Sequence, residues 1–245
     1  MPIVLKKKYS QNFLIDKNIL IKISNLIPTE NLKILEIGPG NGKLTDRIIL
    51  KKPKKLTLVE IDKDLFKEIN EKYFNNSIIE LINADILKFL IKEKYNLVIS
   101  NLPYNISSQI LVKLSLLKSL PNILILMFQK EFAMRLTENK LNSINALVKC
   151  FYNIEKKFNV SKNSFRPIPK VNSSVLTFRK LNKSLIKKKE IEKFILFKRK
   201  IFSQKRKSLK KILKKYKLED KFDLSLRVEN LKLEEFIKLF RAINL

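Results

Sequence analysis

The chain has 245 residues, a formal net charge of +29, no histidine and one cysteine. This length suffices for one well-packed core and a small second domain. The absence of histidine excludes Ser-His-Asp triads, histidine bases and histidine-ligated metal sites. The single cysteine, Cys150, excludes an internal disulfide and a cysteine-ligated zinc cluster. The surplus of positive charge predicts a polyanionic partner such as nucleic acid, with a compositional bias toward lysine as the alternative explanation.

The chain shows no pattern typical of export or of a membrane protein. Its N-terminal residues contain no apolar segment long enough for a signal peptide, and the longest apolar run, residues 123–128, is typical of a strand. Cys150 lies in another apolar run, where a small core residue is expected. We therefore expect a cytoplasmic protein without a membrane segment.

A basic arm, residues 6–16, precedes the first predicted helix, which spans residues 17–26. Asp16 stands directly before that helix. Aspartate is a favoured N-cap, because its carboxylate accepts hydrogen bonds from the free N–H groups of the first turn. On composition alone, the arm is an ordinary lead-in to the helix.

All three glycines of the chain, Gly38, Gly40 and Gly42, stand at alternate positions between two regular segments. Glycine is needed where a Cβ atom would block a turn with positive φ or the close approach of a ligand. A strand (residues 34–37), a glycine turn and a helix (residues 43–50) are typical of the first part of a nucleotide-binding α/β unit. The spacing differs from the G-x-G-x-x-G dinucleotide fingerprint. We predict a ligand site here, with a tight turn without a ligand as the alternative.

The next two predicted strands, residues 56–60 and 78–82, lead to acidic side chains at the same expected sheet edge. Glu60, at the tip of the first strand, is placed to accept hydrogen bonds from ribose hydroxyls, while Asp62 is expected to cap the following helix. Asp85 follows the second strand. A glycine turn and two acids suit an adenosine with a neutral or positively charged tail. This pattern leaves both NAD and S-adenosylmethionine open.

The fourth predicted strand, residues 95–100, runs into Asn101, Leu102, Pro103 and Tyr104. The proline restricts the chain just beyond the strand, which places the Asn101 amide, the Leu102 carbonyl and the Tyr104 ring beside the glycine turn. The two oxygens can accept both N–H bonds of the exocyclic amine of an aminopurine while the ring stacks on the base. Loss of planarity at that nitrogen would free its lone pair for attack on a methyl group without a general base.

A structural explanation of the same motif is a strand end turned by proline, with Ser107 as the N-cap of a helix that reaches residue 118. Two explanations, one structural and one functional, are also open for Phe165. It lies in a proline-bearing loop with two cations, where it is either a loop anchor or a second stacking surface for an everted base.

The remaining elements complete the predicted sheet. Helices are expected over residues 63–73, 130–136 and from about residue 142, and strands over residues 122–129, 151–160 and 173–180. Five parallel-type strands are thus followed by a terminal pair joined without a helix. That count favours the seven-stranded methyltransferase plan over the two mononucleotide halves of a dehydrogenase.

We predict an α/β fold in which a Rossmann-like, seven-stranded methyltransferase domain spans residues 1–181 and a small all-helical domain spans residues 182–245. Residues 183–217 contain sixteen Lys and Arg and only two acidic residues, interleaved with apolar residues at helical spacing. This pattern predicts an apolar stripe against the first domain and a cationic face toward RNA. A merely solvated helical face is the alternative.

The motifs together resemble those of the ribosomal RNA adenine dimethyltransferases, specifically the small-subunit dimethyladenosine transferases, from Tyr9 to about Phe240. The resemblance is carried by residues 11–14, 36–42, 83–85, 101–106, 129–131, 165–171, 202–207 and 227–230. It implies contacts to S-adenosyl-L-methionine from Asn12, Leu14, Gly38, Gly40, Glu60, Asp85 and Asn101. It implies handling of the target adenine by Asn101, Leu102, Pro103, Tyr104 and Phe165.

Members of this family dimethylate N6 of two adjacent adenosines in the 3′-terminal hairpin loop of small-subunit ribosomal RNA, within a 30S-type pre-ribosomal particle. The resemblance therefore implies the same substrate here, and a monomer without a metal or a membrane partner is expected. Ser10 replaces the usual glycine before Gln11, and Leu141-Asn142 replaces a common Tyr-Gly pair. These departures affect the hinge of the arm and any RNA contact at residues 141–142, and leave the cofactor site intact.

Two other functions remain open from the sequence. Large-subunit adenine methylation of the antibiotic-resistance type shares the Asn-Leu-Pro-Tyr motif, although the long basic C-terminal segment and the loop at residues 165–171 favour the small-subunit enzyme. A ribosome-assembly or transcription factor that retains the fold without turnover is the alternative from another class. Cytosine C5 methylation is disfavoured, because it needs a cysteine nucleophile at the sheet edge.

Overall fold

The computed structural model describes residues 12–216 and 222–243. Of the basic arm predicted over residues 6–16, residues 6–11, with the Ser10 departure, lie outside them, as does part of the C-terminal segment. The chain divides into two compact units, one of Met1–Ala133 with Ile154–Lys180 and one of Met134–Asn153 with Leu181–Leu245. The predicted division after residue 181 stays a prediction.

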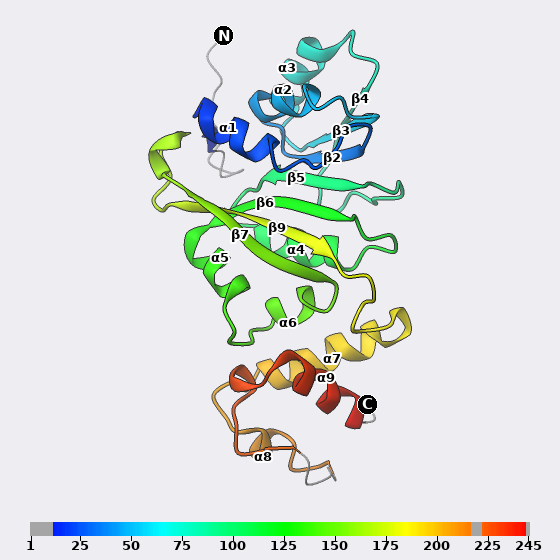
Figure 1. Cartoon of the computed structure of the whole chain (residues 1–245), viewed down its shortest axis with the longest axis vertical. Helices are drawn as coiled ribbons and strands as arrows, with labels where there is room; N and C mark the ends of the chain where they lie inside the picture. Colours follow the sequence, from blue (N-terminus) through cyan, green and yellow to red (C-terminus); the bar gives the residue numbers. More distant parts are fainter. Residues whose placement is uncertain (1–11, 217–221, 244–245) are drawn as a thin grey trace. The chain divides into compact units, whose positions relative to one another are not determined.

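A seven-stranded sheet forms the centre of the first unit (Figure 1), in the order β4-β3-β2-β5-β6-β9-β7. Its strands are β2 (Lys33–Ile37), β3 (Lys55–Glu60), β4 (Ile79–Asn83), β5 (Leu97–Asn101), β6 (Ile123–Gln129), β7 (Tyr152–Val160) and β9 (Ser173–Lys180). The five strands from β2 to β6 pair in parallel. β9 pairs antiparallel with β6. The predicted seven-stranded plan is confirmed.

The central strands are apolar on both faces, as expected for parallel strands covered on both sides by helices. Ile34 and Leu35 of β2 and Leu58 and Val59 of β3 are all buried, although neighbours in a strand point to opposite faces. The sheet order reverses between β2 and β5, so the carboxyl ends of these two strands border a crevice.

Helices precede, connect and follow the parallel strands close to the predicted positions. They are α1 (Lys17–Ser24), α2 (Lys43–Ile49), α3 (Lys63–Tyr73), α4 (Ser107–Ser115) and α5 (Lys130–Thr137). Both predicted aspartate caps are confirmed, because Asp16 accepts hydrogen bonds from the N–H groups of Asn18 and Ile19, and Asp62 accepts one from Asp64. Ser107, which the structural explanation of the Asn101 motif makes the N-cap of α4, is not the cap. Ile106 occupies the N-cap, and the Ser107 hydroxyl donates to the Tyr104 carbonyl instead.

A second, two-stranded sheet was not predicted from the sequence. β1 (Phe13–Leu14) pairs antiparallel with β8 (Phe165–Arg166), which follows a short 3-10 helix at Lys162–Ser164. The side chains of Asp16 and Ser164 reinforce this pairing, since the Ser164 hydroxyl donates to the Asp16 carboxylate at 3.0 Å. The pairing joins the start of the first unit to the loop before β9.

The second unit consists of short helices around an aromatic cluster. They are α6 (Asn145–Val148), α7 (Ile191–Phe202), α8 (Leu209–Ile212) and α9 (Leu233–Ala242), with 3-10 turns at Lys188–Glu190 and Val228–Asn230. The Phe236 ring of α9 lies 5.0 Å from that of Phe197 and 5.5 Å from that of Phe202. Contacts of this kind favour edge and tilted geometries, and they form the core of this unit.

The basic segment of the second unit is amphipathic, as predicted, and its apolar stripe packs against α9 of the same unit, where the Phe194 and Phe197 rings contact those of Phe236 and Phe240. The predicted packing of this stripe against the first domain stays a prediction. Phe194, Phe197 and Ile201 of α7 are fully buried, whereas most of its cations are exposed. Lys198 is an exception. It is buried, and its ammonium group donates to the Ser143 carbonyl at 2.8 Å.

Two details of the second unit bear on predictions from the sequence, namely the start of a helix and the place of the cysteine. The helix predicted from residue 142 begins three residues later, because the Asn142 carboxamide accepts hydrogen bonds from the N–H groups of Ile144 and Asn145. Cys150 is fully buried and its thiol donates to the Ala146 carbonyl, which confirms a core cysteine. Among the described residues, no helix is both long and apolar enough to cross a membrane.

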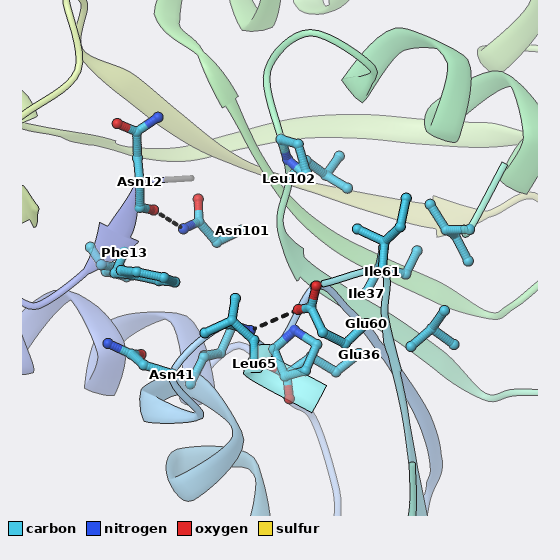
Figure 2. A pocket seen from close by; sticks show the side chains of 18 of the residues that line it. Asn12, Phe13, Glu36, Ile37, Asn41, Glu60, Ile61, Leu65, Asn101 and Leu102 are labelled. Carbon is cyan, nitrogen blue, oxygen red and sulfur yellow. Dashed lines mark hydrogen bonds between the residues drawn. The ribbon is translucent and has the colours of Figure 1, made fainter. Parts of the chain in front are cut away.

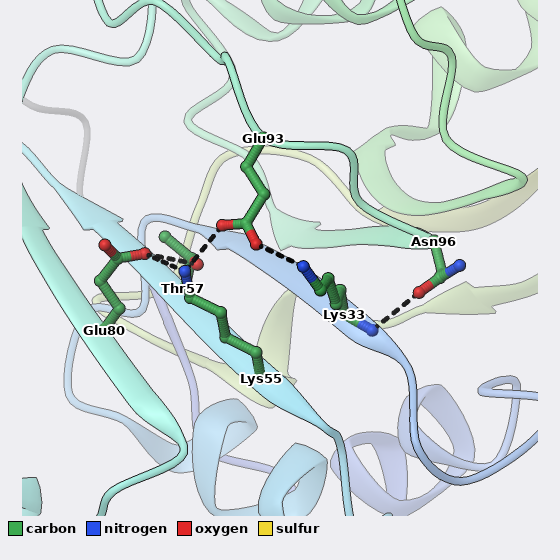
Figure 3. A network of polar contacts seen from close by, with 6 residues as sticks. All are labelled: Lys33, Lys55, Thr57, Glu80, Glu93 and Asn96. Carbon is green, nitrogen blue, oxygen red and sulfur yellow. Dashed lines mark hydrogen bonds and ion pairs between the residues drawn. The ribbon is translucent and has the colours of Figure 1, made fainter.

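A polar network crosses the amino-terminal ends of the strands, opposite the crevice (Figure 3). The ammonium group of Lys55 lies 2.7 Å from the Glu93 carboxylate and 3.0 Å from that of Glu80. Lys33 completes the network, 2.9 Å from the other Glu93 oxygen. Because Lys33 begins β2, Lys55 begins β3 and Glu80 lies in β4, Glu93 links neighbouring strands through two cations.

We expect Glu93→Gln to lower the free energy of unfolding by about 1 kcal/mol at neutral pH, because it removes two partly exposed ion pairs. The hydrogen bonds from Lys55 and Lys33 lower the pKa of Glu93 in the folded protein. Its contribution is therefore present above the ordinary carboxyl pKa and is lost as the pH falls through the lowered value. Urea unfolding at several pH values measures both effects. A difference between the two proteins that stays constant down to the acid limit would contradict this assignment.

Candidate active site

A cleft of about 940 Å³, a volume that includes open solvent at its mouth, lies at the carboxyl ends of the parallel strands. Figure 2 shows side chains from β1, the glycine turn, β3 and β5 converging on it. All of the residues predicted to contact a cofactor line this cleft: Asn12, Leu14, Gly38, Gly40, Glu60, Asp85 and Asn101. So do Leu102, Pro103 and Tyr104 from the predicted target-base group.

The glycine turn has the backbone that its composition predicted. Gly38, Gly40 and Gly42 have φ angles of +66°, +59° and +74°. A Cβ atom on Gly40 would meet the Phe13 ring at 2.9 Å, and one on Gly42 would meet the Tyr73 hydroxyl at 2.7 Å. At Gly38 the same position is open, so a side chain there would extend into free space beside the cleft.

Glu60 ends β3 and is held by backbone donors. One carboxylate oxygen accepts from the Gly40 N–H at 3.3 Å and the other from the Asp62 N–H at 2.9 Å. Burial raises the pKa of this carboxyl above its usual value. Its hydrogen bond to Gly40 joins β3 to the glycine turn at the wall of the cleft (Figure 2).

Glu36 is a cleft residue that the sequence reasoning missed. It lies in β2 two residues before Gly38, is fully buried, and accepts a hydrogen bond from the Thr45 hydroxyl at 2.7 Å. Burial raises its pKa to about 8. The signal was available, since an acidic residue in an otherwise apolar buried strand must have a specific partner.

Asp85 follows β4 and lies in a segment fixed from two sides. Its carboxylate accepts from the Leu87 N–H at 2.9 Å. The ammonium group of Lys113 in α4 donates to the carbonyls of Leu87 and Phe89 at 2.9 and 2.6 Å. Asp85 thus lines the cleft from a turn that these hydrogen bonds hold in place.

Asn101 ends β5 with its amide orientation fixed. Its NH2 group donates to the Asn12 carbonyl at 3.0 Å, so its side-chain oxygen remains the acceptor (Figure 2). Leu102 is buried, and the hydroxyl of the half-buried Tyr104 lies 2.6 Å from that of Ser173. Asn101, Leu102 and Tyr104 all line the cleft.

Phe165 lies elsewhere. Its side chain is fully buried in the hydrophobic core, and its backbone pairs with Leu14 in the small sheet. In this conformation the ring is the loop anchor of the two alternatives. Phe13 is a further lining residue that the sequence reasoning missed, because a two-residue strand carries no periodicity.

Comparisons with known proteins identify the family of this chain. A family model described as ribosomal RNA adenine dimethylase matches residues 4–244. Ribosomal RNA small subunit methyltransferase A of Mycoplasmopsis pulmonis is 38% identical, over 96% of this chain and 97% of the relative. The protein of the same name from Pelagibacter ubique is 39% identical, over 96% and 95%.

Solved structures show the same fold. A dimethyladenosine transferase from Plasmodium falciparum has a TM-score of 0.81 at 27% identity, covering 93% of this chain and 95% of that one. The 23S rRNA methyltransferase ErmE shares the fold at a TM-score of 0.77 and 23% identity, covering 95% of this chain and 100% of its own. With a family match along almost its whole length, the chain belongs to the ribosomal RNA adenine dimethylase family.

Proposed function

We propose that this protein dimethylates N6 of two adjacent adenosines in the 3′-terminal hairpin loop of small-subunit ribosomal RNA, with S-adenosylmethionine as the methyl donor. The observation that carries the proposal is that the glycine turn, Glu60, Asp85 and the Asn101 motif border a single cleft. The similarity to relatives named small subunit methyltransferases supports the choice of the small subunit. We further propose that the RNA is methylated within a 30S-type pre-ribosomal particle and that the enzyme is a monomer.

The residues present suit the cofactor. The backbone at Gly38 lines the cleft with open space where a Cβ would stand, so a ligand can approach it closely. Glu60 is positioned to accept hydrogen bonds from ribose hydroxyls, and Asp85 from an adenine amine. Asn12, Leu14 and Gly40 would form the remaining contacts. When bound, S-adenosylmethionine supplies an electrophilic methyl group next to its sulfonium.

The Asn101 motif would act on the target base. The Asn101 side-chain oxygen and the Leu102 carbonyl accept the two N–H bonds of the adenine amine, while Tyr104 stacks on the ring. These hydrogen bonds draw the nitrogen out of conjugation, so its lone pair becomes nucleophilic. Positioning and fixed dipoles then account for the rate without a histidine base. Phe165 would need to leave the core to stack on the base, so its part in catalysis remains a prediction.

We expect the purified protein to transfer labelled methyl groups from S-adenosylmethionine to undermethylated small subunits, with dimethyladenosine at the 3′ end of the RNA. Mass spectrometry of that RNA fragment identifies the product and its position. Intact large subunits serve as the control substrate. Label only on large-subunit RNA, DNA or protein would refute the proposed substrate, and cofactor binding without any transfer would favour a non-catalytic assembly factor.

We expect Asn101→Ala to lower the turnover number by about 10²-fold or more, as does loss of a preorganised polar group in other enzymes. The matched control is Asn96→Ala, just before the start of β5, where the side chain accepts a hydrogen bond from Lys33 at the opposite sheet edge. Both variants should fold, as checked by thermal unfolding, and only the first should lose methyl transfer. Equal activity of the two would contradict the role of Asn101.

Binding to RNA should weaken about 10³-fold between about 50 mM and about 200 mM salt if six or more phosphates are contacted. Lys205 and Arg206 are exposed in the second unit, and Lys63 and Lys67 are exposed on α3. We expect the double alanine variant of the first pair to reduce the salt slope by about 1 to 2, and that of the second pair to leave it unchanged. Filter binding across a salt series measures the slope. An equal change in both variants would count against a specific cationic face.

A further inference from the structure

A short loop beside the cleft exposes apolar and cationic side chains together. We call residues 166–172 the proline loop. Ile168 is 52% exposed and Val171 is 37% exposed, whereas most large apolar side chains of the first unit are buried. Arg166 and Lys170 are exposed on the same loop, and residues 162–172 contain no acidic residue.

Both ends of the proline loop contact residues that line the cleft. At the start, Arg166 pairs with Phe13, which lines the cleft. At the end, the hydroxyl of Ser173 lies 2.6 Å from that of Tyr104, another lining residue. Both ends of the loop are therefore anchored to residues that line the cleft, within a single compact unit.

Its backbone is well restrained. The Asn172 carbonyl accepts from the Lys130 N–H and its side chain from the Lys162 N–H, both at 2.9 Å. Two prolines fix φ within the loop, and Pro169 is buried. Exposing apolar side chains to water costs free energy. When a restrained loop beside a site exposes them, they mark an interaction surface.

We propose that Ile168 and Val171 insert into the base stack next to the target adenosine and hold open the gap that it leaves when it enters the cleft. This inference rests on the proposed function. Enzymes that modify a base must extrude it, which costs a few kcal/mol of stacking. Aliphatic side chains act as wedges between base steps in other nucleic-acid complexes.

The charges on the loop favour RNA over a protein partner. Arg166 donates through one guanidinium nitrogen to the Phe165 carbonyl at 2.9 Å, which orients the group and leaves further N–H donors. Arg166, Lys170 and Lys162 place three exposed positive charges on the segment that carries Ile168 and Val171. This charge is complementary to the phosphates on either side of an extruded nucleotide.

The test compares the wild-type protein with the double variant Ile168→Ala/Val171→Ala. The substrate is the small subunit assembled with a 3′-terminal RNA fragment. We expect the specificity constant, kcat/KM, for methyl transfer to fall at least about tenfold, because the cost of unstacking is no longer offset. Affinity for S-adenosylmethionine should not change, since neither residue lines the cleft. Leu50→Ala is the matched control, because Leu50 is an exposed apolar residue at the far end of α2 from the glycine turn.

Two further measurements separate a wedge from a merely structural loop. With 2-aminopurine at the target position, binding of the wild-type protein should raise the fluorescence as the base unstacks, and the double variant should lose most of this rise. An RNA with an abasic site beside the target should restore methylation by the variant to within about twofold of wild type, because the stacking cost is already removed.

Wild-type-like activity of the double variant, or an equal loss on the abasic RNA, would overturn the wedge. A wild-type protein that methylates neither RNA would instead refute the proposed function. A fluorescence rise in that case, lost in the double variant, would still support the wedge as an RNA contact.

Discussion

The left-handed backbone of the glycine turn is the constraint on which the cleft depends. Three residues with positive φ bring the chain around the end of β2 without side chains. Other side chains fill the space beside two of these glycines, because the Phe13 ring lies against Gly40 and the Tyr73 hydroxyl against Gly42. The Gly40 N–H then binds Glu60, so the same turn positions the acid at the end of the next strand. A chain with glycine at only these three positions in 245 residues concentrates that freedom where a ligand must approach.

The small β1–β8 sheet joins the two chemical halves of the site. Asn12, just before its first strand, and Leu14 of that strand line the cleft, while Phe165 and Arg166 of its second strand lead into the proline loop. The Asn12 carbonyl also fixes the Asn101 amide. A hydrogen bond therefore connects two residues that we predict to hold the cofactor, one of which, Asn101, we also predict to hold the target base.

Much of this architecture could be predicted from the sequence, because its signals are local. The bounds of α3 match the prediction, since Asp62 caps a strongly periodic segment. The seven strands were visible as short apolar runs between polar strand ends. What could not be predicted depends on contacts distant in sequence. The pairing of Leu14 with Phe165 spans most of the first unit and has no periodic signal. Glu36 appeared as part of an apolar strand, and its partner Thr45 became evident only in three dimensions. Ser107 has the right residue type for a cap, yet the Tyr104 carbonyl takes its hydroxyl.

The central claim is that one cleft aligns a sulfonium nucleoside with an everted adenine amine. A crystal structure of the protein with S-adenosylmethionine tests it most directly. The account predicts the ribose at Glu60, the adenine at Asp85 and the methyl group directed at the Asn101 side-chain oxygen and the Leu102 carbonyl. An empty cleft at saturating cofactor, or a methyl group that points away from Asn101, would contradict it.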